Sequence, residues 1–203
     1  MNELIDSGKP LVSSLGLSYD GRRVVCVVPK ISPFSDDGRI VLLRGVNGAG
    51  KTTWLRWLYS NFNVVMLPCE LDFPKHLRPR EIEKLFGSSE EHSLFDLLVP
   101  EDRPWMHLSA GNRQKTRIRT VLKAVMKSVA KGSAKLLLLD EPTTALDEKA
   151  QAALWRILIE LAKRHAPDLK IVVATHDKYL EDTFEGSFAT WFVHNETHPV
   201  GLT

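Results

Sequence analysis

The sequence has few of the features that mark secreted and membrane-spanning proteins. Its 203 residues include two cysteines, which are too few for a disulfide scaffold and are typical of a reducing compartment. The longest apolar runs, such as the leucines at 136–139, are far shorter than the roughly 18 residues that a membrane span needs. The first ten residues are polar, so we expect no secretory signal there. We therefore expect a cytoplasmic protein that reaches any membrane through a partner.

Charge and composition are unremarkable in the same way. The formal net charge is +2, which gives no global reason to expect a nucleic acid or a membrane surface as partner. The chain contains 43% hydrophobic and 26% charged residues, which is ordinary for a globular protein with a sizeable core. We expect a single domain over residues 1–203. Within it, the apolar pattern weakens over residues 74–107 into short helical pieces, which predicts a small helical lobe.

Apolar stretches alternate with helical patterns along the chain. The helical patterns cover residues 51–60, 112–131 and 148–165, and Asp147 is the expected cap of the last. The alternation predicts an α/β fold with a mainly parallel sheet flanked by helices. We interpret the "HNETH" segment at 194–198 as a polar tail. Strands are predicted at Ile40–Leu43, Val64–Leu67, Leu136–Leu139, Ile171–Ala174 and Phe188–Val193, with Arg23–Val28 as an edge strand.

The segment "GVNGAGKTT" matches the phosphate-loop pattern G-x-x-x-x-G-K-[ST] and lies between a predicted strand and a predicted helix. Glycines let the backbone fold so that several N–H groups converge on a phosphate. Lys51 would reach the β- and γ-phosphates, and the Thr52 hydroxyl would bind Mg²⁺. The predicted nucleotide-binding residues of this loop are Gly45, Asn47, Gly48, Ala49, Gly50, Lys51, Thr52 and Thr53.

Two acidic residues follow the most apolar predicted strand. Asp140 stands at its carboxyl end and can hold Mg²⁺ directly or through water. Glu141 would face the γ-phosphate and can orient and deprotonate the attacking water. His176 ends another predicted strand, at the edge of the sheet where ligands collect, and we expect it to contact the γ-phosphate. Together with Lys51, these residues predict hydrolysis of a nucleotide with Mg²⁺ as cofactor.

A further phosphate site is indicated by "HLSAGNRQK", His107–Lys115, where small residues precede a long helix. A helix N-terminus carries a partial positive charge and suits an anion. Because the chain already has a phosphate loop, the pattern leaves open which phosphate this helix start would serve.

These four motifs, in this order, resemble those of ABC-type ATPases, the nucleotide-binding domains of ATP-binding-cassette proteins. "LSAGNRQ" resembles the family's signature loop, usually "LSGGQ", and "TALD" at 144–147 resembles its D-loop. The resemblance covers roughly residues 15 to 180 and implies a P-loop NTPase fold with a reduced helical lobe. It implies Mg-dependent ATP hydrolysis by two domains paired head to tail, either two copies or this chain with another cassette. Ser109 and the Gly111 amide would then bind the partner's γ-phosphate, and Asp147 would lie in the loop beside it.

Several positions depart from the family pattern. Ala110 replaces a signature glycine, which is tolerable if its φ angle is negative, and Asn112 replaces a glutamine. Cys69 stands where the family has a glutamine that reaches Mg²⁺; a thiol is a poor ligand for this ion, and Glu70 is the alternative. The resemblance also implies an adenine-stacking aromatic before the first core strand, for which we favour Tyr19, with Phe34 as the alternative.

The chain is also shorter than transporter cassettes in the regions that the resemblance covers. The antiparallel β-subdomain is mostly missing from its usual position after the phosphate-loop helix, and the helical lobe is abbreviated. We favour the ATPase subunit of a membrane transporter, bound to an integral membrane partner on the inner face of a membrane. The alternative is a soluble ABC ATPase that acts on nucleic acid, ribosomes or another protein assembly. A regulator without hydrolysis is disfavoured because four residues of the site are all present, namely Lys51, Asp140, Glu141 and His176.

Two further patterns are interpreted as structural. Trp54, Trp57 and Leu58 recur at helical spacing and are expected in the core rather than at a stacking site. Basic residues recur every four positions on the helix after the signature loop, and we favour a solvated face over a nucleic-acid surface. The stripe consists of Lys115, Arg119, Lys123, Lys127 and Lys131.

Overall fold

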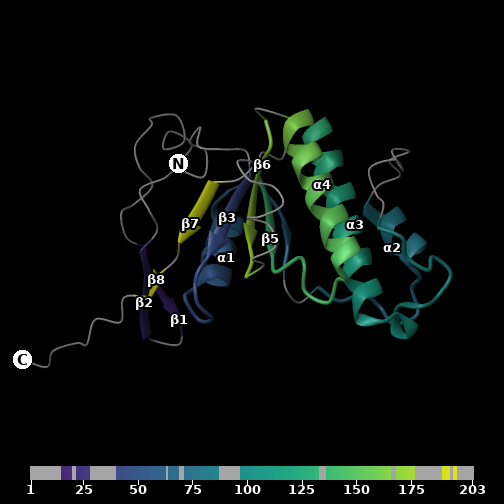
Figure 1. The fold of residues 1–203 in the computed structure, drawn as a ribbon, viewed down its shortest axis with the longest axis horizontal. Helices are drawn as coiled ribbons and strands as arrows, with labels where there is room; N and C mark the ends of the chain where they lie inside the picture. The colour runs from purple at the N-terminus through teal and green to yellow at the C-terminus, as the bar shows by residue number, and fades with distance from the viewer. Residues whose placement is uncertain are drawn as a thin grey trace, which may run out of the picture.

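Five strands form the central sheet of the protein, in the order β4-β5-β6-β3-β7 (Figure 1). Every neighbouring pair in this sheet is parallel. The computed structural model describes residues 15–19, 22–27, 40–62, 64–68, 71–86, 97–132, 136–165, 168–176, 189–192 and 194–195. The strands of the sheet are β3 Ile40–Arg44, β4 Val64–Leu67, β5 Leu136–Asp140, β6 Lys170–Ala174 and β7 Ala189–Phe192.

The two faces of the sheet are covered by different helices. Alternate residues of a strand point to opposite faces, so β3 places Val41 and Leu43 on one face and Leu42 on the other. Helix α1, Lys51–Asn61, covers the face of Val41 and Leu43. Helices α3, Ala110–Ala130, and α4, Glu148–Arg164, cover the opposite face and bury their apolar stripes against it (Figure 1). The predicted α/β fold with a parallel sheet between helices is confirmed.

Local sequence explains where the two long helices begin. The hydroxyl of Ser109 accepts a hydrogen bond from the Asn112 N–H and caps α3. The helix therefore begins at Ala110, two residues earlier than the sequence pattern predicts. The carboxylate of Asp147 accepts from the Ala150 N–H at 2.8 Å and caps α4, as predicted. Gly132, with φ of 66°, follows the end of α3 in the left-handed conformation that favours glycine.

A second sheet contains three antiparallel strands in the order β1-β2-β8. Its strands are β1 Leu15–Tyr19, β2 Arg22–Val27 and β8 His194–Asn195. The prediction that Arg23–Val28 is an edge strand is therefore wrong, because β2 is the central strand of this second sheet. The interpretation of 194–198 as a polar tail is wrong at its first two residues. Both errors have one cause: β2 pairs with a segment more than 160 residues later, and an apolar run does not identify its partner strand.

The region between β4 and α3 carries the short helices α2, Pro79–Phe86, and η2, Trp105–His107. Ile82, Trp105 and Leu108 are buried together there, with Phe73 and Leu77 packed against them. Figure 1 shows α2 beside α3, on the side away from the sheet. No helix among the described residues is long and apolar enough to cross a membrane.

The expected core positions of α1 are confirmed. Trp54 is 2% exposed and Leu58 is fully buried, and Trp57 packs edge-to-face on Phe62 with ring centroids 5.9 Å apart.

The interpretation of the basic stripe as a solvated face is wrong for its central residues. Arg119 and Lys123 are each 7% exposed and both pair with Glu83 of α2. Lys115 lies 3.4 Å from the carboxylate of Asp147. The basic residues do recur at helical spacing, but Arg119 and Lys123 lie inside the protein, where the carboxylate of Glu83 neutralises their charges.

Candidate active site

The loop between β3 and α1 has the backbone shape of a phosphate-binding turn. Gly48 and Gly50 have φ angles of +79° and +97°, in the left-handed region that side chains disfavour. Space alone would admit a side chain at Gly48, since a Cβ there would meet nothing within 4 Å, so the backbone angle is what requires glycine. Gly50 directly precedes the first turn of α1. A turn of this shape at a helix N-terminus is suited to a phosphate.

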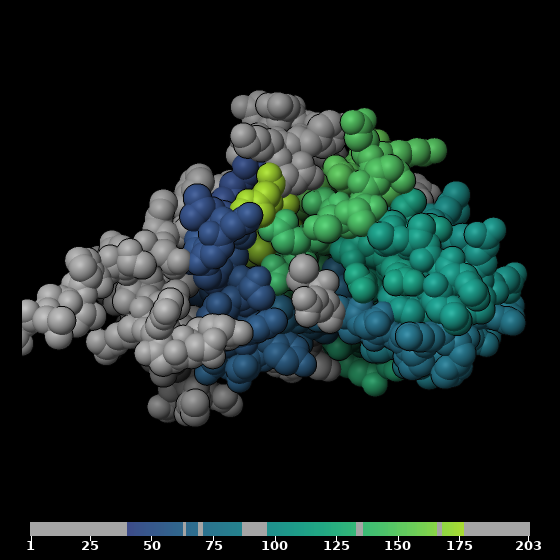
Figure 2. Space-filling view, turned by 90° about the horizontal axis from the view of Figure 1, so that it is seen from below, coloured from purple at the N-terminus to yellow at the C-terminus, as the bar shows by residue number. Residues whose placement is uncertain are grey.

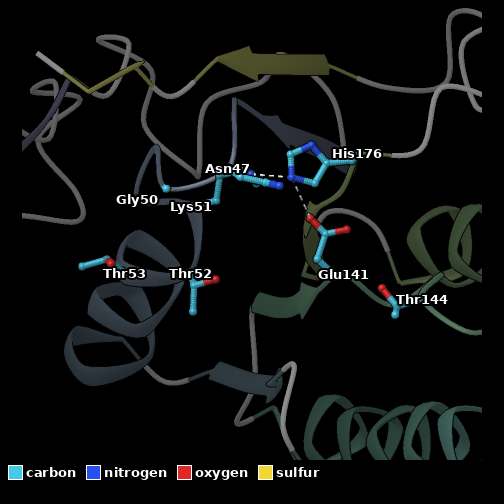
Figure 3. Close-up of a pocket in the computed structure, with 9 residues that line it drawn as sticks. Asn47, Gly50, Lys51, Thr52, Thr53, Glu141, Thr144 and His176 are labelled. Atoms are coloured by element: carbon cyan, nitrogen blue, oxygen red, sulfur yellow. Dashed lines mark hydrogen bonds and ion pairs between the residues drawn. The ribbon is translucent and has the colours of Figure 1, made fainter. Parts of the chain in front are cut away.

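Lys51 extends from the start of α1 back over the loop. Its Nζ atom donates hydrogen bonds to the carbonyl oxygens of Gly45 at 2.9 Å and Val46 at 3.3 Å. The same atom lies 2.8 Å from Nε2 of His176 (Figure 3). Burial lowers the pKa of Lys51, while the charges of Glu141 and Asp140 oppose this shift. The lysine is therefore a buried cation held beside the histidine that follows β6.

Asp140, at the end of β5, is 2% exposed. Burial raises the pKa of its carboxyl group, against a hydrogen bond from the Thr52 side chain and the charge of Arg56. Its Oδ2 atom is buried and has no hydrogen-bond partner within the described ranges. A buried carboxylate oxygen without a partner, beside a hydroxyl group, is a donor set that Mg²⁺ accepts. Thr52 and Asp140 therefore fit the metal ion that a P-loop NTPase uses.

Glu141 follows β5 with a φ angle of 47°, an uncommon conformation for a residue with a side chain. Its N–H donates to the Ala174 carbonyl at 2.9 Å, which holds it against the end of β6. Its Oε1 lies 3.4 Å from Nε2 of His176. Burial raises the pKa of Glu141, and the charge and the backbone N–H of His176 oppose this rise. A carboxyl group with a raised pKa is a better proton acceptor near neutral pH.

Lys51, Glu141 and His176 line one cavity of about 530 Å³. Figure 2 shows residues at the end of β6 against the phosphate loop and α1, and Figure 3 shows His176 between Lys51 and Glu141. Thr144 also lines the cavity, although the motifs predict no contact with nucleotide for it; its position three residues after Glu141, at the start of the D-loop-like segment, is the signal that points to it. The lining residues are Asn47, Gly48, Gly50, Lys51, Thr52, Thr53, Glu141, Thr144 and His176.

The signature-loop residues do not line this cavity. Ser109 is exposed and caps α3, and Gly111 lies in the first turn of that helix. Ala110 has a helical backbone, so the alanine meets the condition of a negative φ angle. Asp147 caps α4, and the Ala150 N–H lowers the pKa of its carboxyl group. The structure therefore separates these residues from the cavity that holds Lys51.

Other predicted positions lie outside the described residues. Cys69 and Glu70 fall between the described ranges, so neither is placed as the magnesium ligand. Tyr19 is the last residue of β1, and its side chain is not described. Phe34 lies outside the described ranges.

Comparisons with known proteins identify the family. The family model of the NACHT domain, a P-loop NTPase domain, matches residues 39–195. The cytochrome c biogenesis ATP-binding export protein CcmA of Hyphomonas neptunium is 32% identical over 174 residues, covering 75% of this chain and 84% of that protein. The hemin import ATP-binding protein HmuV of Vibrio parahaemolyticus is 28% identical over 223 residues, covering 91% and 80%. The dimeric post-hydrolysis structure of the ATP-binding cassette MJ0796, bound to ADP and Pi, is similar with a TM-score of 0.55, at 15% identity and coverage of 85% and 88%.

The NACHT match and the curated relatives agree on the P-loop core and differ on the branch. The signature-like segment at 108–114 and the curated relatives both favour the ATP-binding cassettes, and the solved structure has the same fold. The chain is a P-loop NTPase and belongs to the ABC-type ATP-binding proteins.

Proposed function

We propose that this chain is the ATP-hydrolysing subunit of a membrane transporter and that it works as a dimer around two ATP molecules. The observation that carries the ATPase proposal is the convergence of Lys51, Glu141 and His176 on one cavity, with Asp140 buried behind Thr52. Curated relatives named for hemin import and for export in cytochrome c biogenesis support the transporter role over a soluble assembly. A position at the cytoplasmic face of a membrane, through an integral membrane partner, follows from this proposal.

In the proposed mechanism, each residue has a physical task. The turn at Gly48–Gly50 and the ammonium group of Lys51 bind the phosphates. The Thr52 hydroxyl and the Asp140 carboxylate would hold Mg²⁺, which neutralises phosphate charge when bound. Glu141 accepts a proton from the attacking water while the water oxygen bonds to the γ-phosphorus and the bond between the γ-phosphorus and ADP breaks. His176 lies against both Lys51 and Glu141 and would position them at the γ-phosphate.

The remaining assignments belong to the same proposal. Ser109, Gly111 and Asp147 lie away from their own chain's cavity, so we assign them to the nucleotide of a partner cassette in a head-to-tail dimer. The dimeric state of the cassette named above supports this arrangement. Tyr19 as the adenine-stacking residue and Glu70 as a further Mg²⁺ ligand remain proposals. We also propose that residues 1–203 form one domain with a helical lobe at 74–107, the segment that contains α2 and η2.

The central test is Glu141→Gln, which keeps size and removes the proton acceptor. We expect ATP hydrolysis to slow by about 10²- to 10⁴-fold, with ATP affinity unchanged within about twofold. Glu148→Gln, the same substitution at an exposed position on α4, is the control and should leave the rate unchanged. Normal turnover in Glu141→Gln would contradict the assignment of the base.

The transporter role has a separate test. Glu141→Gln should hold ATP without hydrolysing it, so the protein purified with ATP from detergent-solubilised source cells should retain its partner. A stoichiometric integral membrane protein is the expected result. Recovery of nucleic acid or a soluble assembly in its place would overturn the transporter proposal and leave the ATPase proposal intact.

A further inference from the structure

The first turns of α3 are fastened to the segment that follows Glu141. Gln114 is 7% exposed, and its Nε2 donates a hydrogen bond to the carbonyl oxygen of Pro142 at 3.0 Å. Pro142 is the residue directly after Glu141, so this bond acts on the backbone that carries the proposed base. A buried amide–carbonyl bond of this kind is costly to leave unmade.

Gly111 makes a second contact with the same segment. A Cβ atom at Gly111 would lie 2.9 Å from the carbonyl oxygen of Ala145, a distance that real Cβ atoms avoid. Only glycine allows α3 to approach this backbone so closely. One turn further along the helix, Lys115 reaches Asp147 at 3.4 Å. Three successive points between 142 and 147 therefore touch the N-terminal part of α3.

The segment from Glu141 to Asp147, which α3 contacts, has strained backbone at Glu141 and Ala145. Glu141 and Ala145 have φ angles of 47° and 64°, which cost free energy in residues with side chains and persist when the surroundings impose them. A second cavity, of about 260 Å³, separates Glu141 from α3. Its lining residues are Ala110, Arg113, Gln114, Arg117, Glu141, Thr144 and Ala145. Glu141 has room on this side, so packing against α3 does not fix its position, which depends on its contact with His176 and on the backbone bonds around it.

We propose that Gln114 is a positioning residue that sets Glu141 of its own chain according to where the signature end of α3 lies. This inference rests on the proposed function, in which Ser109 and Gly111 bind the partner's ATP. Gln114 lies three residues after Gly111 on the same helix, so a shift of the first turn of α3 would displace Gln114 as well. The shift then reaches Pro142 and Glu141 through the 3.0 Å bond. ATP bound at the site that contains Ser109 and Gly111 thereby moves Glu141 of the same chain into position at its own nucleotide.

The test is Gln114→Glu in the full chain, purified together with the integral membrane partner proposed above. The substitution keeps the shape and keeps an oxygen for the Arg117 guanidinium, which lies 3.3 Å from Gln114 Oε1. It replaces the donor facing Pro142 with a carboxylate oxygen, which cannot donate and which repels the carbonyl. We expect kcat to fall about 10- to 100-fold, KM for ATP to change less than about twofold, and the Hill coefficient for ATP to fall from above 1 to 1.

Gln151→Glu is a matched control, because Gln151 Nε2 donates at 3.0 Å to the carbonyl of Leu146 in the same segment, but from α4. It should leave the Hill coefficient at the wild-type value. If Gln114→Glu does not fold by circular dichroism, Gln114→Met removes the donor without adding charge. A wild-type Hill coefficient of 1, an unchanged one in the Gln114 variant, or an equal loss in Gln151→Glu would overturn the inference. Failure of the proposed function would show differently, as normal turnover in Glu141→Gln.

Discussion

Asp140 is a carboxylate that the fold buries at an energetic cost. Because burial raises its pKa above the ordinary value of 3.8, the folded state holds this proton more tightly than the unfolded state does. Stability therefore falls as pH rises from 3.8 through the raised pKa, because ionisation removes a proton that the folded state holds more tightly than the unfolded state does. A metal ion at the buried Oδ2 atom would offset this cost.

Asp140→Asn should therefore stabilise the protein at neutral pH in EDTA, by up to about 1–3 kcal/mol, because it removes a desolvated charge. Urea unfolding measures this change. In the same variant, Mg²⁺ with ATP should raise the melting temperature less than it does in the wild type. Asp168→Asn, at an exposed position, is the control and should alter neither quantity. A less stable Asp140→Asn protein with an undiminished Mg²⁺ response would contradict the prediction.

The sequence predicts the cavity residues well for a physical reason. Lys51 begins α1, Asp140 ends β5 and is followed by Glu141, and His176 lies two residues after β6. In a parallel sheet the carboxyl ends of the strands share one edge. Their approach within hydrogen-bond distance could be expected from order alone. The role of Gln114 could not, because its partner is a backbone carbonyl 28 residues away and no side-chain pattern marks a carbonyl.

Helices α2 and α3 are joined by a buried ionic cluster. Glu83 of α2 is 3% exposed, and its Oε1 lies 2.8 Å from Nε of Arg119 while its Oε2 lies 2.5 Å from Nζ of Lys123. Arg119 also donates to the Leu97 carbonyl. One buried carboxylate therefore pairs with two buried cations and joins α2 to α3.

Glu83→Ala should destabilise the protein by about 3–5 kcal/mol, because it removes the buried carboxylate that Arg119 and Lys123 share. Urea unfolding gives the change in the free energy of unfolding. The control is Glu160→Ala on α4, which breaks an exposed pair with Arg164 at 3.4 Å and should cost less than about 1 kcal/mol. Equal effects of the two substitutions would show that the cluster is not a buried network.

The same elements show where sequence patterns lose information. Helical periodicity gives the spacing of Arg119 and Lys123 but not what faces them, so it could not distinguish solvent from Glu83, about 40 residues earlier. The second sheet presents the same problem, since β2 pairs with β8 across most of the chain. The strands and helices themselves were predictable from their apolar patterns, whereas the strand that completes the second sheet and the carboxylate that faces Arg119 and Lys123 were not.

In the proposed dimer, each nucleotide site takes residues from both chains, because the phosphate-loop cavity and the start of α3 are separate features of one chain. The cavity holds the phosphate loop, Glu141 and His176, whereas Ser109 at the start of α3 is exposed and outside it. A single chain therefore carries a nucleotide cavity and, separately, a helix start suited to an anion. Dimer formation should depend on the second feature and ATP binding by the monomer on the first.

Ser109→Asp separates these two functions in the Glu141→Gln background. Aspartate preserves the helix cap that Ser109 provides to the Asn112 N–H, so α3 should stay intact, but its charge would face the phosphate of the partner's nucleotide. Like charges at an interface cost several kcal/mol, so the dissociation constant of the ATP-bound dimer should rise roughly tenfold or more. ATP affinity of the monomer should stay within about twofold. Analytical ultracentrifugation with ATP measures the dimer, and Ser60→Asp, at an exposed position near the far end of α1, is the control. Equal losses of dimerisation and monomer binding would place the signature loop at its own chain's nucleotide, and an unchanged dimer would remove it from the interface.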